Sequence, residues 1–460
     1  MIRLSAGQIT EILAAESHGV HADDAVLTVT VDSREATAGS MYVAIPGERV
    51  DGHDFAQAAI DSGAVVVLSE RRLPVPCIVV ENTVTALGLL AQHVRRQLTD
   101  CAVVAITASS GKTSTKDLLA QVLAGLGATV APVGSFNTEV GVPLTILRAD
   151  ESTRFLILEM GMRGLGHIEL LCRIAEPQIG VLVNVGSAHL GLLGSRAGVA
   201  RAKGELIASL PASGVAVLNG DDVLVSEQAA RTSARTVLFG RSESCQVRAR
   251  SIRLDEQARA SFTLAIGDEQ AAIGLQLAGE HFVDNALAVA AVAHELGMGI
   301  DQIAQGLSAA RISSRWRMEI SVTADGVTIV NDAYNANPES MAAALRTLSA
   351  MGTDQRRWAV VGEMLELGEQ SSAEHAKLGR LAARAGVDRL LCIGTATMVT
   401  QAQAQAHADW RGQADWVPDV SAAVVLLEAE IRPTDIVLIK ASRGVGLERL
   451  AAALGEREAQ

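Results

Sequence analysis

The chain has 460 residues, which at about 150 residues per domain predicts roughly three domains. Its composition is 49% hydrophobic, enough to give each domain a core, so disordered and fibrous classes are excluded. The formal net charge of −13 disfavours nucleic acid or an anionic membrane surface as the main partner.

The most apolar segments, residues 101–108 and 179–185, are too short to cross a bilayer. Residues 1–17 contain Glu11 and Glu16 and lack the unbroken apolar stretch of a signal peptide. The five cysteines are scattered without a C-x-x-C pair, which is typical of free thiols. We therefore expect a cytoplasmic protein without stable membrane insertion. We also expect a monomer.

Residues 1–98 are predicted to form a small α/β domain. Short β-type runs, such as residues 26–31 and 64–68, alternate there with helical stretches, such as residues 85–98.

The central part, residues 99–312, is predicted to contain a mainly parallel sheet with helices on both faces, because apolar strands are separated by crossover segments. The predicted strands are residues 103–107, 155–158, 179–183 and 215–218. Residues 248–277 alternate between polar and apolar side chains and predict a β appendage. The alternating rhythm returns in residues 313–460. The fold class is therefore α/β with three domains, the central one of P-loop type and the C-terminal one Rossmann-like.

The strongest local signal is T-A-S-S-G-K-T at residues 107–113, between an apolar strand and a helix. Backbone N–H groups of such a loop wrap a phosphate, Lys112 supplies charge to the outer phosphates, and the Thr113 hydroxyl suits Mg²⁺. The phosphate-binding residues expected here are Ser109, Ser110, Gly111, Lys112, Thr113 and Ser114. The usual pattern has glycine where Ile106 stands, so a serine-rich turn with a solvated lysine is the alternative.

Two further strands end in residues that can carry chemistry, Glu159 and His189. In a doubly wound sheet the carboxyl ends of the strands face one crevice, so both side chains would lie near the phosphate loop. Glu159 then suits Mg²⁺, and His189 can be a further ligand or orient one. Taken singly, a helix cap and an ordinary polar histidine are the favoured explanations; the convergence of both residues with the phosphate loop makes them candidates.

Lys203 has an unusual place on its predicted helix. At about 100° per residue it falls in the middle of the apolar stripe that includes Val199 and Leu206. Either its stem packs while the ammonium reaches water, or the amine is held inside. An amine held inside has a lowered pKa and is available as a neutral nucleophile, or it needs an anionic partner.

Two polar turns mark the third domain. In N-D-A-Y-N-A-N-P-E-S at residues 331–340, a loop that can read a polar ligand contains Asp332, Tyr334, Asn335 and Asn337; turn formation and helix capping are the alternative. Near the C-terminus, Lys440, Ser442 and Arg443 follow a strand and can bind a carboxylate or phosphate, or form a solvated basic turn.

Together these motifs resemble the Mur ligases of bacterial peptidoglycan synthesis, across all three domains. The motifs are D-S-R at residues 32–34, the loop at 107–113, F-N-T-E-V-G-V-P from 136, E-M-G from 159, N-V-G-S-A-H from 184, A-K-G-E from 202, S-R-W-R-M-E around 315, the 331–340 cluster, G-E-M-L-E-L-G from 362 and K-A-S-R from 440. The resemblance implies an ATP-dependent amide ligase. It is closest to the branch that joins D-alanyl-D-alanine to UDP-MurNAc-tripeptide, both small-molecule substrates, through an acyl phosphate.

The resemblance also implies roles for individual residues. His189 would help to bind a second Mg²⁺, and Lys203 would be carbamylated by CO₂ and become an anionic metal ligand beside Thr113 and Glu159. The remaining implied contacts are Arg315, Asp332, Asn335 and Asn337 with nucleotide, Ser33 and Arg34 with the UDP substrate, Asn137 and Thr138 with substrate, and Lys440, Ser442 and Arg443 with the acceptor.

Two departures from the family pattern are visible: Ala108 replaces a loop glycine, and Thr138 replaces an asparagine. The sibling ligase that adds the diamino residue is an alternative, although its D-N-P-R signature is absent. A P-loop nucleotide switch without ligase activity is a second alternative, disfavoured because no N-K-x-D motif occurs.

Overall fold

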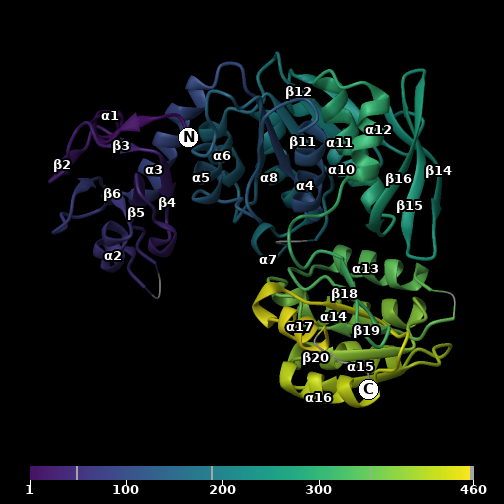
Figure 1. The fold of residues 1–460 in the computed structure, drawn as a ribbon. Helices are drawn as coiled ribbons and strands as arrows, with labels where there is room; N and C mark the ends of the chain where they lie inside the picture. The colour runs from purple at the N-terminus through teal and green to yellow at the C-terminus, as the bar shows by residue number, and fades with distance from the viewer. Residues whose placement is uncertain (48–49, 188–189, 353, 456–460) are drawn as a thin grey trace.

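The computed structural model describes residues 1–47, 50–187, 190–352 and 354–455. Figure 1 shows an N-terminal lobe, a central lobe and a C-terminal lobe, each an arrangement of helices around a sheet. The predicted α/β class with mainly parallel sheets is confirmed. Within the described part of the chain, none of the helices combines the length and apolar character that a bilayer-spanning segment needs.

The N-terminal lobe is built on a five-stranded sheet in the order β2-β7-β6-β5-β4, parallel except for β2, and on a short pair β1-β3. Its strands are β1 (Leu4–Ser5), β2 (Glu16–His18), β3 (Ala25–Val26), β4 (Thr28–Thr30), β5 (Ser40–Val43), β6 (Ala64–Ser69) and β7 (Cys77–Val79). Its helices are α1 (Ala6–Ile12), α2 (Ala56–Asp61) and α3 (Thr83–Gln97). Asn82 caps the N-terminus of α3, because its side chain accepts a hydrogen bond from the Thr85 N–H at 2.8 Å.

Helix α3 also packs against the central lobe, on α5 (Gly141–Ile146) and α6 (His167–Ala175). The Arg95 guanidinium donates to the Ala175 carbonyl at 3.0 Å and to the Glu176 carbonyl at 3.2 Å. One apolar core therefore runs from the N-terminal sheet through α3 into the central lobe.

The central lobe contains a nine-stranded sheet in the order β16-β15-β14-β13-β12-β11-β8-β10-β9. Pairings from β9 to β14 are parallel, and β14, β15 and β16 form the antiparallel extension predicted from residues 248–277. The strands are β8 (Ala102–Thr107), β9 (Thr129–Val130), β10 (Phe155–Glu159), β11 (Ile179–Leu182), β12 (Val215–Asn219), β13 (Arg235–Gly240), β14 (Val247–Leu254), β15 (Arg259–Ile266) and β16 (Glu269–Ala278).

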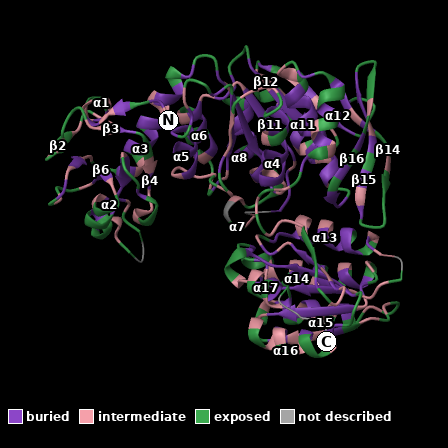
Figure 2. Cartoon of the chain, in the orientation of Figure 1, coloured by how far each residue is buried: buried purple, intermediate pink, exposed green. Residues whose placement is uncertain are grey.

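Strand β8 is buried on both faces because helices cover the sheet on each side. Val103 and Ala105 belong to the core shared with the N-terminal lobe, whereas Val104 and Ile106 belong to a second core. The second core includes α4 (Lys112–Leu123), α11 (Phe282–Glu295) and α12 (Ile300–Ala309). The other helices of this lobe are α7 (Leu190–Leu193), α8 (Arg196–Lys203), α9 (Glu205–Ala208) and α10 (Val223–Ser226). Figure 2 shows the buried strands of this lobe in purple.

The C-terminal lobe has a six-stranded sheet in the order β17-β18-β22-β19-β20-β21, parallel except for β17. Its strands are β17 (Glu319–Val322), β18 (Thr328–Asn331), β19 (Arg357–Val361), β20 (Arg389–Ile393), β21 (Gln413–Val417) and β22 (Ile436–Lys440). Helices α13 (Pro338–Ala350), α14 (Ser371–Arg384) and α15 (Met398–Gln405) pack on one face, and α16 (Val420–Glu430) and α17 (Glu448–Gly455) pack on the other.

Candidate functional site

The predicted phosphate loop lies at the carboxyl end of β8, directly before α4. Gly111 has φ +82°, and a Cβ there would lie 2.8 Å from Asn285 Oδ1, so only glycine fits without a shift. Asn184 fixes the loop, because its Oδ1 accepts from the N–H groups of Ser109 at 3.1 Å and Ser110 at 3.0 Å.

Ala108 does not disturb this loop. Its side chain is fully buried in the second core, and its φ is not positive, so the conformation is open to any L-residue. The departure from glycine at this position therefore introduces no backbone strain.

Thr113 and Glu159 lie together beside the loop. The Thr113 hydroxyl donates to Glu159 Oε2 at 2.8 Å, and Asn137 Nδ2 donates to Oε1 of the same carboxylate at 2.7 Å. Ser135 Oγ lies 3.0 Å from Thr113 Oγ1. Glu159 is only 1% exposed, so two donors hold a buried carboxylate at the end of the phosphate loop.

Lys112 and Lys203 approach the loop from different elements. The amine of Lys112 donates to the Ala108 carbonyl at 2.8 Å, and that of Lys203 donates to the same oxygen at 2.9 Å. Burial, and secondly the Lys112 charge, holds the pKa of Lys203 well below its ordinary value. Burial also lowers the pKa of Lys112, opposed by Glu159. Lys203 is therefore held inside and does not reach water.

The polar turn after β18 faces the phosphate loop from the C-terminal lobe. Asn337 caps α13 and donates through Nδ2 to the Ser109 carbonyl at 3.3 Å. Lys440 Nζ donates to Asp332 Oδ2 at 2.6 Å and to the Asn335 carbonyl at 2.8 Å. The two lobes thus share one polar cleft.

This cleft has a volume of about 320 Å³. The predicted site residues that line it are Ser109, Ser110, Gly111, Lys112, Thr113, Ser114, Asn137, Glu159, Asp332, Asn335, Asn337 and Lys440. Tyr334 of the predicted polar turn also lines it, and residues that reach the same cleft without having been assigned a role include Ser135, His281, Asp284, Asn285 and Arg317. Lys203 is buried behind the loop.

Arg317, and not the predicted Arg315, is the arginine of the cleft. Its Nη2 donates to Ser135 Oγ at 2.9 Å, and its guanidinium stacks 4.1 Å from the centre of the Tyr334 ring. Arg315 is exposed and does not line the cleft. The S-R-W-R-M-E segment itself contains no signal that favours the second arginine over the first.

His281 and Asn285 come from the start of α11, next to the phosphate loop. Burial lowers the pKa of His281 to about 4, so the ring is neutral at physiological pH. Both are polar residues at the edge of an otherwise apolar, Ala-rich helix, and that interruption was the signal for them in the sequence.

Several predicted substrate residues lie elsewhere. Ser33 and Arg34 form an exposed turn of the N-terminal lobe, where hydrogen bonds from Arg34 lower the Asp32 pKa to about 2. The others that do not line the cleft are Thr138, Ser442 and Arg443. Ser442 is buried, with its Oγ accepting from the Leu365 N–H at 2.9 Å, and Arg443 stacks on Trp316. His189 lies outside the described residues.

Comparison with known proteins assigns a family to all three lobes. The Mur ligase middle domain matches residues 106–293, the Mur ligase glutamate ligase domain matches residues 316–443, and the Mur ligase family catalytic domain matches residues 26–95.

Individual relatives match over nearly the whole chain. A Mycobacterium tuberculosis protein named UDP-N-acetylmuramoyl-tripeptide–D-alanyl-D-alanine ligase is 44% identical over 99% of this chain and 98% of its own. The crystal structure of MurF from Acinetobacter baumannii superposes with a TM-score of 0.89 at 30% identity and covers 99% of both chains. MurF from Thermotoga maritima in complex with ADP gives a TM-score of 0.79 at 29% identity, covering 93% of this chain and 97% of that one. The chain therefore belongs to the Mur ligase family, as the resemblance in its motifs predicted.

Proposed function

We propose that this enzyme is an ATP-dependent ligase that joins D-alanyl-D-alanine to UDP-MurNAc-tripeptide in peptidoglycan synthesis. The observation that carries the proposal is the pairing of Thr113 with the buried Glu159 carboxylate at the end of a phosphate loop. The names of the relatives support the dipeptide-adding branch over the sibling that adds the diamino residue.

The chemistry joins two negatively charged groups. A substrate carboxylate oxygen attacks the γ-phosphorus of ATP, the bond from that phosphorus to the β,γ-bridging oxygen breaks, and the products are an acyl phosphate and ADP. The amine of D-alanyl-D-alanine then attacks the carbonyl carbon, loses a proton and expels phosphate. Positioning and charge neutralisation dominate such a transfer. Lys112 and Arg317 supply positive charge at the loop, and Asn335, Asn337 and Asp332 face the nucleotide from the C-terminal lobe.

The residues beside the loop fit Mg²⁺, which prefers oxygen ligands and usually takes only one or two carboxylates besides substrate phosphates. Glu159 and Thr113 supply a carboxylate and a hydroxyl in contact with each other. Among residues 1–47, 50–187, 190–352 and 354–455, no group of three or more His, Cys, Asp or Glu side chains could hold a metal by itself. When bound, Mg²⁺ would neutralise phosphate charge. The role of His189 at a second ion stays a prediction.

Carbamylation of Lys203 belongs to the same proposal. A carbamate forms from a neutral amine, and burial keeps this amine close to neutrality. The product would be an anion next to Lys112, which shares the Ala108 carbonyl with Lys203. The modification would thereby replace a neutral amine beside the Lys112 cation with an anion that pairs with it.

In this scheme residues 1–98 bind the UDP substrate, with Ser33 and Arg34 as contacts. Residues 99–312 bind ATP, with Asn137 and Thr138 toward the substrate. Residues 313–460 close over the nucleotide and bring Lys440, Ser442 and Arg443 to the acceptor. We expect a cytoplasmic monomer.

The deciding assay is phosphate release from ATP with purified enzyme. Release that requires both UDP-MurNAc-tripeptide and D-alanyl-D-alanine supports the proposal. A requirement for the shorter UDP-MurNAc-dipeptide and a diamino acid would assign the sibling reaction instead. Release with neither substrate would indicate a nucleotide switch.

A further inference from the structure

Two adjacent charged residues of α4, Lys116 and Asp117, form a buried ion pair that none of the chemical steps uses. They are 3% and 2% exposed and follow Lys112 and Thr113 by one helical turn. Removing two charges from water is costly unless further hydrogen bonds satisfy them. The partners of this pair therefore indicate its purpose.

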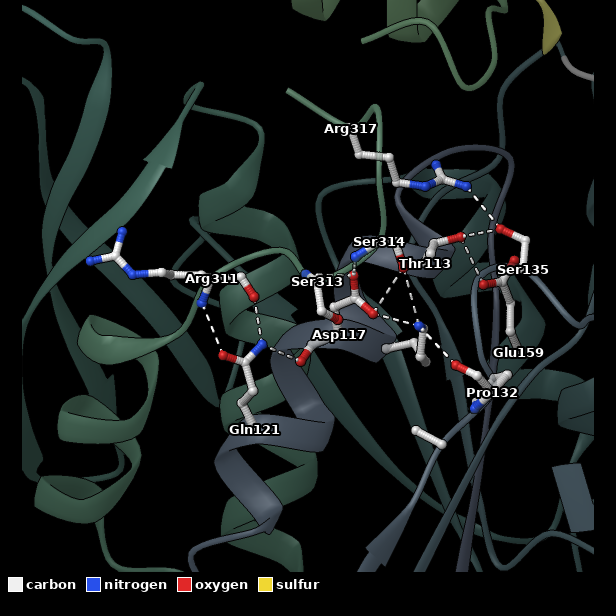
Figure 3. A network of polar contacts seen from close by, with 12 residues as sticks. Thr113, Asp117, Gln121, Pro132, Ser135, Glu159, Arg311, Ser313, Ser314 and Arg317 are labelled. Carbon is white, nitrogen blue, oxygen red and sulfur yellow. Dashed lines mark hydrogen bonds and ion pairs between the residues drawn. The ribbon is translucent and has the colours of Figure 1, made fainter. Parts of the chain in front are cut away.

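The partners of Asp117 belong to the segment that connects the central and C-terminal lobes, and Lys116 shares one of them. Asp117 Oδ2 accepts from the N–H groups of Ser313 at 3.2 Å and Ser314 at 2.9 Å, and Oδ1 accepts from the Ser314 hydroxyl at 3.2 Å. Lys116 Nζ donates to the Pro132 carbonyl at 3.1 Å and to Ser314 Oγ at 3.4 Å. Figure 3 shows the connecting segment docked on α4 through Asp117.

The next residues are held by the other lobe in an unusual backbone conformation. Trp316 has φ +61° and Met318 has φ +51°, which non-glycine residues adopt only when their surroundings enforce it. The Trp316 carbonyl accepts from the Tyr334 N–H at 3.1 Å, and the Met318 N–H donates to Asp332 Oδ1 at 3.2 Å. The Arg317 side chain therefore projects from a short segment whose backbone is held at Ser314 by the central lobe and at Trp316 by the C-terminal lobe.

We infer that Asp117, assisted by Lys116, is a positioning residue that anchors the interdomain connection and thereby delivers Arg317 to the nucleotide. Arg317 contacts Ser135, which lies against Thr113 at the start of the same helix that carries Asp117. The connecting segment is thus attached to α4 twice, directly through Asp117 and indirectly through the contacts from Arg317 to Ser135 and from Ser135 to Thr113 (Figure 3). A segment that is already anchored loses less conformational entropy when Arg317 binds a phosphate group, so the nucleotide binds more tightly. This inference rests on the proposed function only for the identity of the reaction.

The test is a double-mutant cycle read by binding of the non-hydrolysable analogue AMP-PNP in isothermal titration calorimetry. Asp117→Ala and Arg317→Ala should each weaken binding about tenfold, as expected for loss of a hydrogen bond to a charged group. If Asp117 acts through Arg317, the double variant should bind within about twofold of Arg317→Ala. Additive losses, about a hundredfold in the double variant, would overturn the inference.

Gln121→Ala is the matched control. Gln121 lies one turn further along α4, and its Oε1 accepts from the Arg311 N–H at 3.1 Å, so the variant loosens the connection without releasing Ser313 and Ser314. It should bind the analogue like wild type, and a loss equal to that of Asp117→Ala would contradict a specific anchor.

Asp117→Asn keeps the shape and one acceptor, and its cycle with Arg317→Ala replaces the first if the alanine variant does not fold. If Asp117→Asn weakens binding of the analogue by the same factor in wild-type enzyme and in the Arg317→Ala variant, the inference would also be overturned. Failure of the proposed function would appear in a separate measurement, because phosphate release by the wild-type enzyme would then not depend on D-alanyl-D-alanine.

Discussion

Lys112 and Lys203 donate to one carbonyl oxygen, that of Ala108, at 2.8 and 2.9 Å. Lys112 lines the nucleotide cleft, whereas Lys203 is 1% exposed and reaches the oxygen from α8. Two ammonium groups that share an acceptor in a buried place repel each other, so the arrangement favours one charged and one neutral amine. Burial, and secondly the Lys112 charge, lowers the pKa of Lys203 well below its ordinary value, so Lys203 is the amine for which the neutral form is more strongly favoured.

Lys112→Ala should reduce turnover by at least about a hundredfold, because the cation that meets the transferring phosphoryl group is lost. The measurement is the rate of phosphate release with both substrates saturating. Lys377→Ala is the control, since Lys377 is a solvent-exposed residue of α14 paired only with Glu374. A Lys112 variant that keeps wild-type turnover would remove this residue from the reaction.

Lys203→Ala should be nearly inactive and should regain part of its activity when a short carboxylate such as acetate is added. The added anion would occupy the place of the carbamate. Wild-type enzyme incubated with ¹³C-labelled CO₂ should show a carbamate signal by NMR that is absent from the variant. An unmodified lysine in active enzyme would argue against carbamylation.

Lys203→Met should raise the free energy of unfolding at neutral pH in CO₂-free buffer, by about 1–3 kcal/mol. Burial lowers the folded-state pKa below the ordinary 10.5, so between these two values the unfolded chain binds more protons than the folded one. Stability of the wild type therefore rises with pH across that window. The advantage of the variant should shrink as the pH approaches 10.5, and urea denaturation at neutral and alkaline pH measures it. A constant advantage would contradict a buried titrating amine.

Glu159→Gln should raise the Mg²⁺ concentration needed for half-maximal activity about tenfold or more, because an amide is a weaker ligand than a carboxylate. The change keeps an oxygen that can accept from Thr113, so the fold should persist. Glu169→Gln, on the exposed face of α6, should leave the titration unchanged. Coincident Mg²⁺ curves for wild type and Glu159→Gln would place the metal elsewhere.

The sheet architecture was predictable because it follows from local patterns. Continuous apolar runs such as β8 and β10 indicate strands buried on both faces, and the alternation in residues 248–277 indicates strands with one wet face. The helix expected directly after the phosphate loop occurs at Lys112–Leu123.

The predicted phosphate-loop residues and Glu159 gathered where the strand ends meet, but the choice between Arg315 and Arg317 was not predictable from the pattern. That choice depends on two left-handed residues, Trp316 and Met318, which are held by contacts from the C-terminal lobe. His281 and Asn285 likewise reach the cleft only because α11 packs against α4. Tertiary contacts of this kind leave no periodic trace in the sequence.

One apolar core joins the N-terminal sheet to the central sheet through α3, and this core limits movement of the N-terminal lobe relative to the central lobe. Leu87 and Leu90 of α3 share that core with Leu171 of α6, so the N-terminal and central lobes are packed together as one unit. The spacing between the Ser33–Glu35 turn and the phosphate loop is then set by this shared core. The connection to the C-terminal lobe is built differently, because hydrogen bonds from Ser313 and Ser314 to one buried carboxylate hold it to α4.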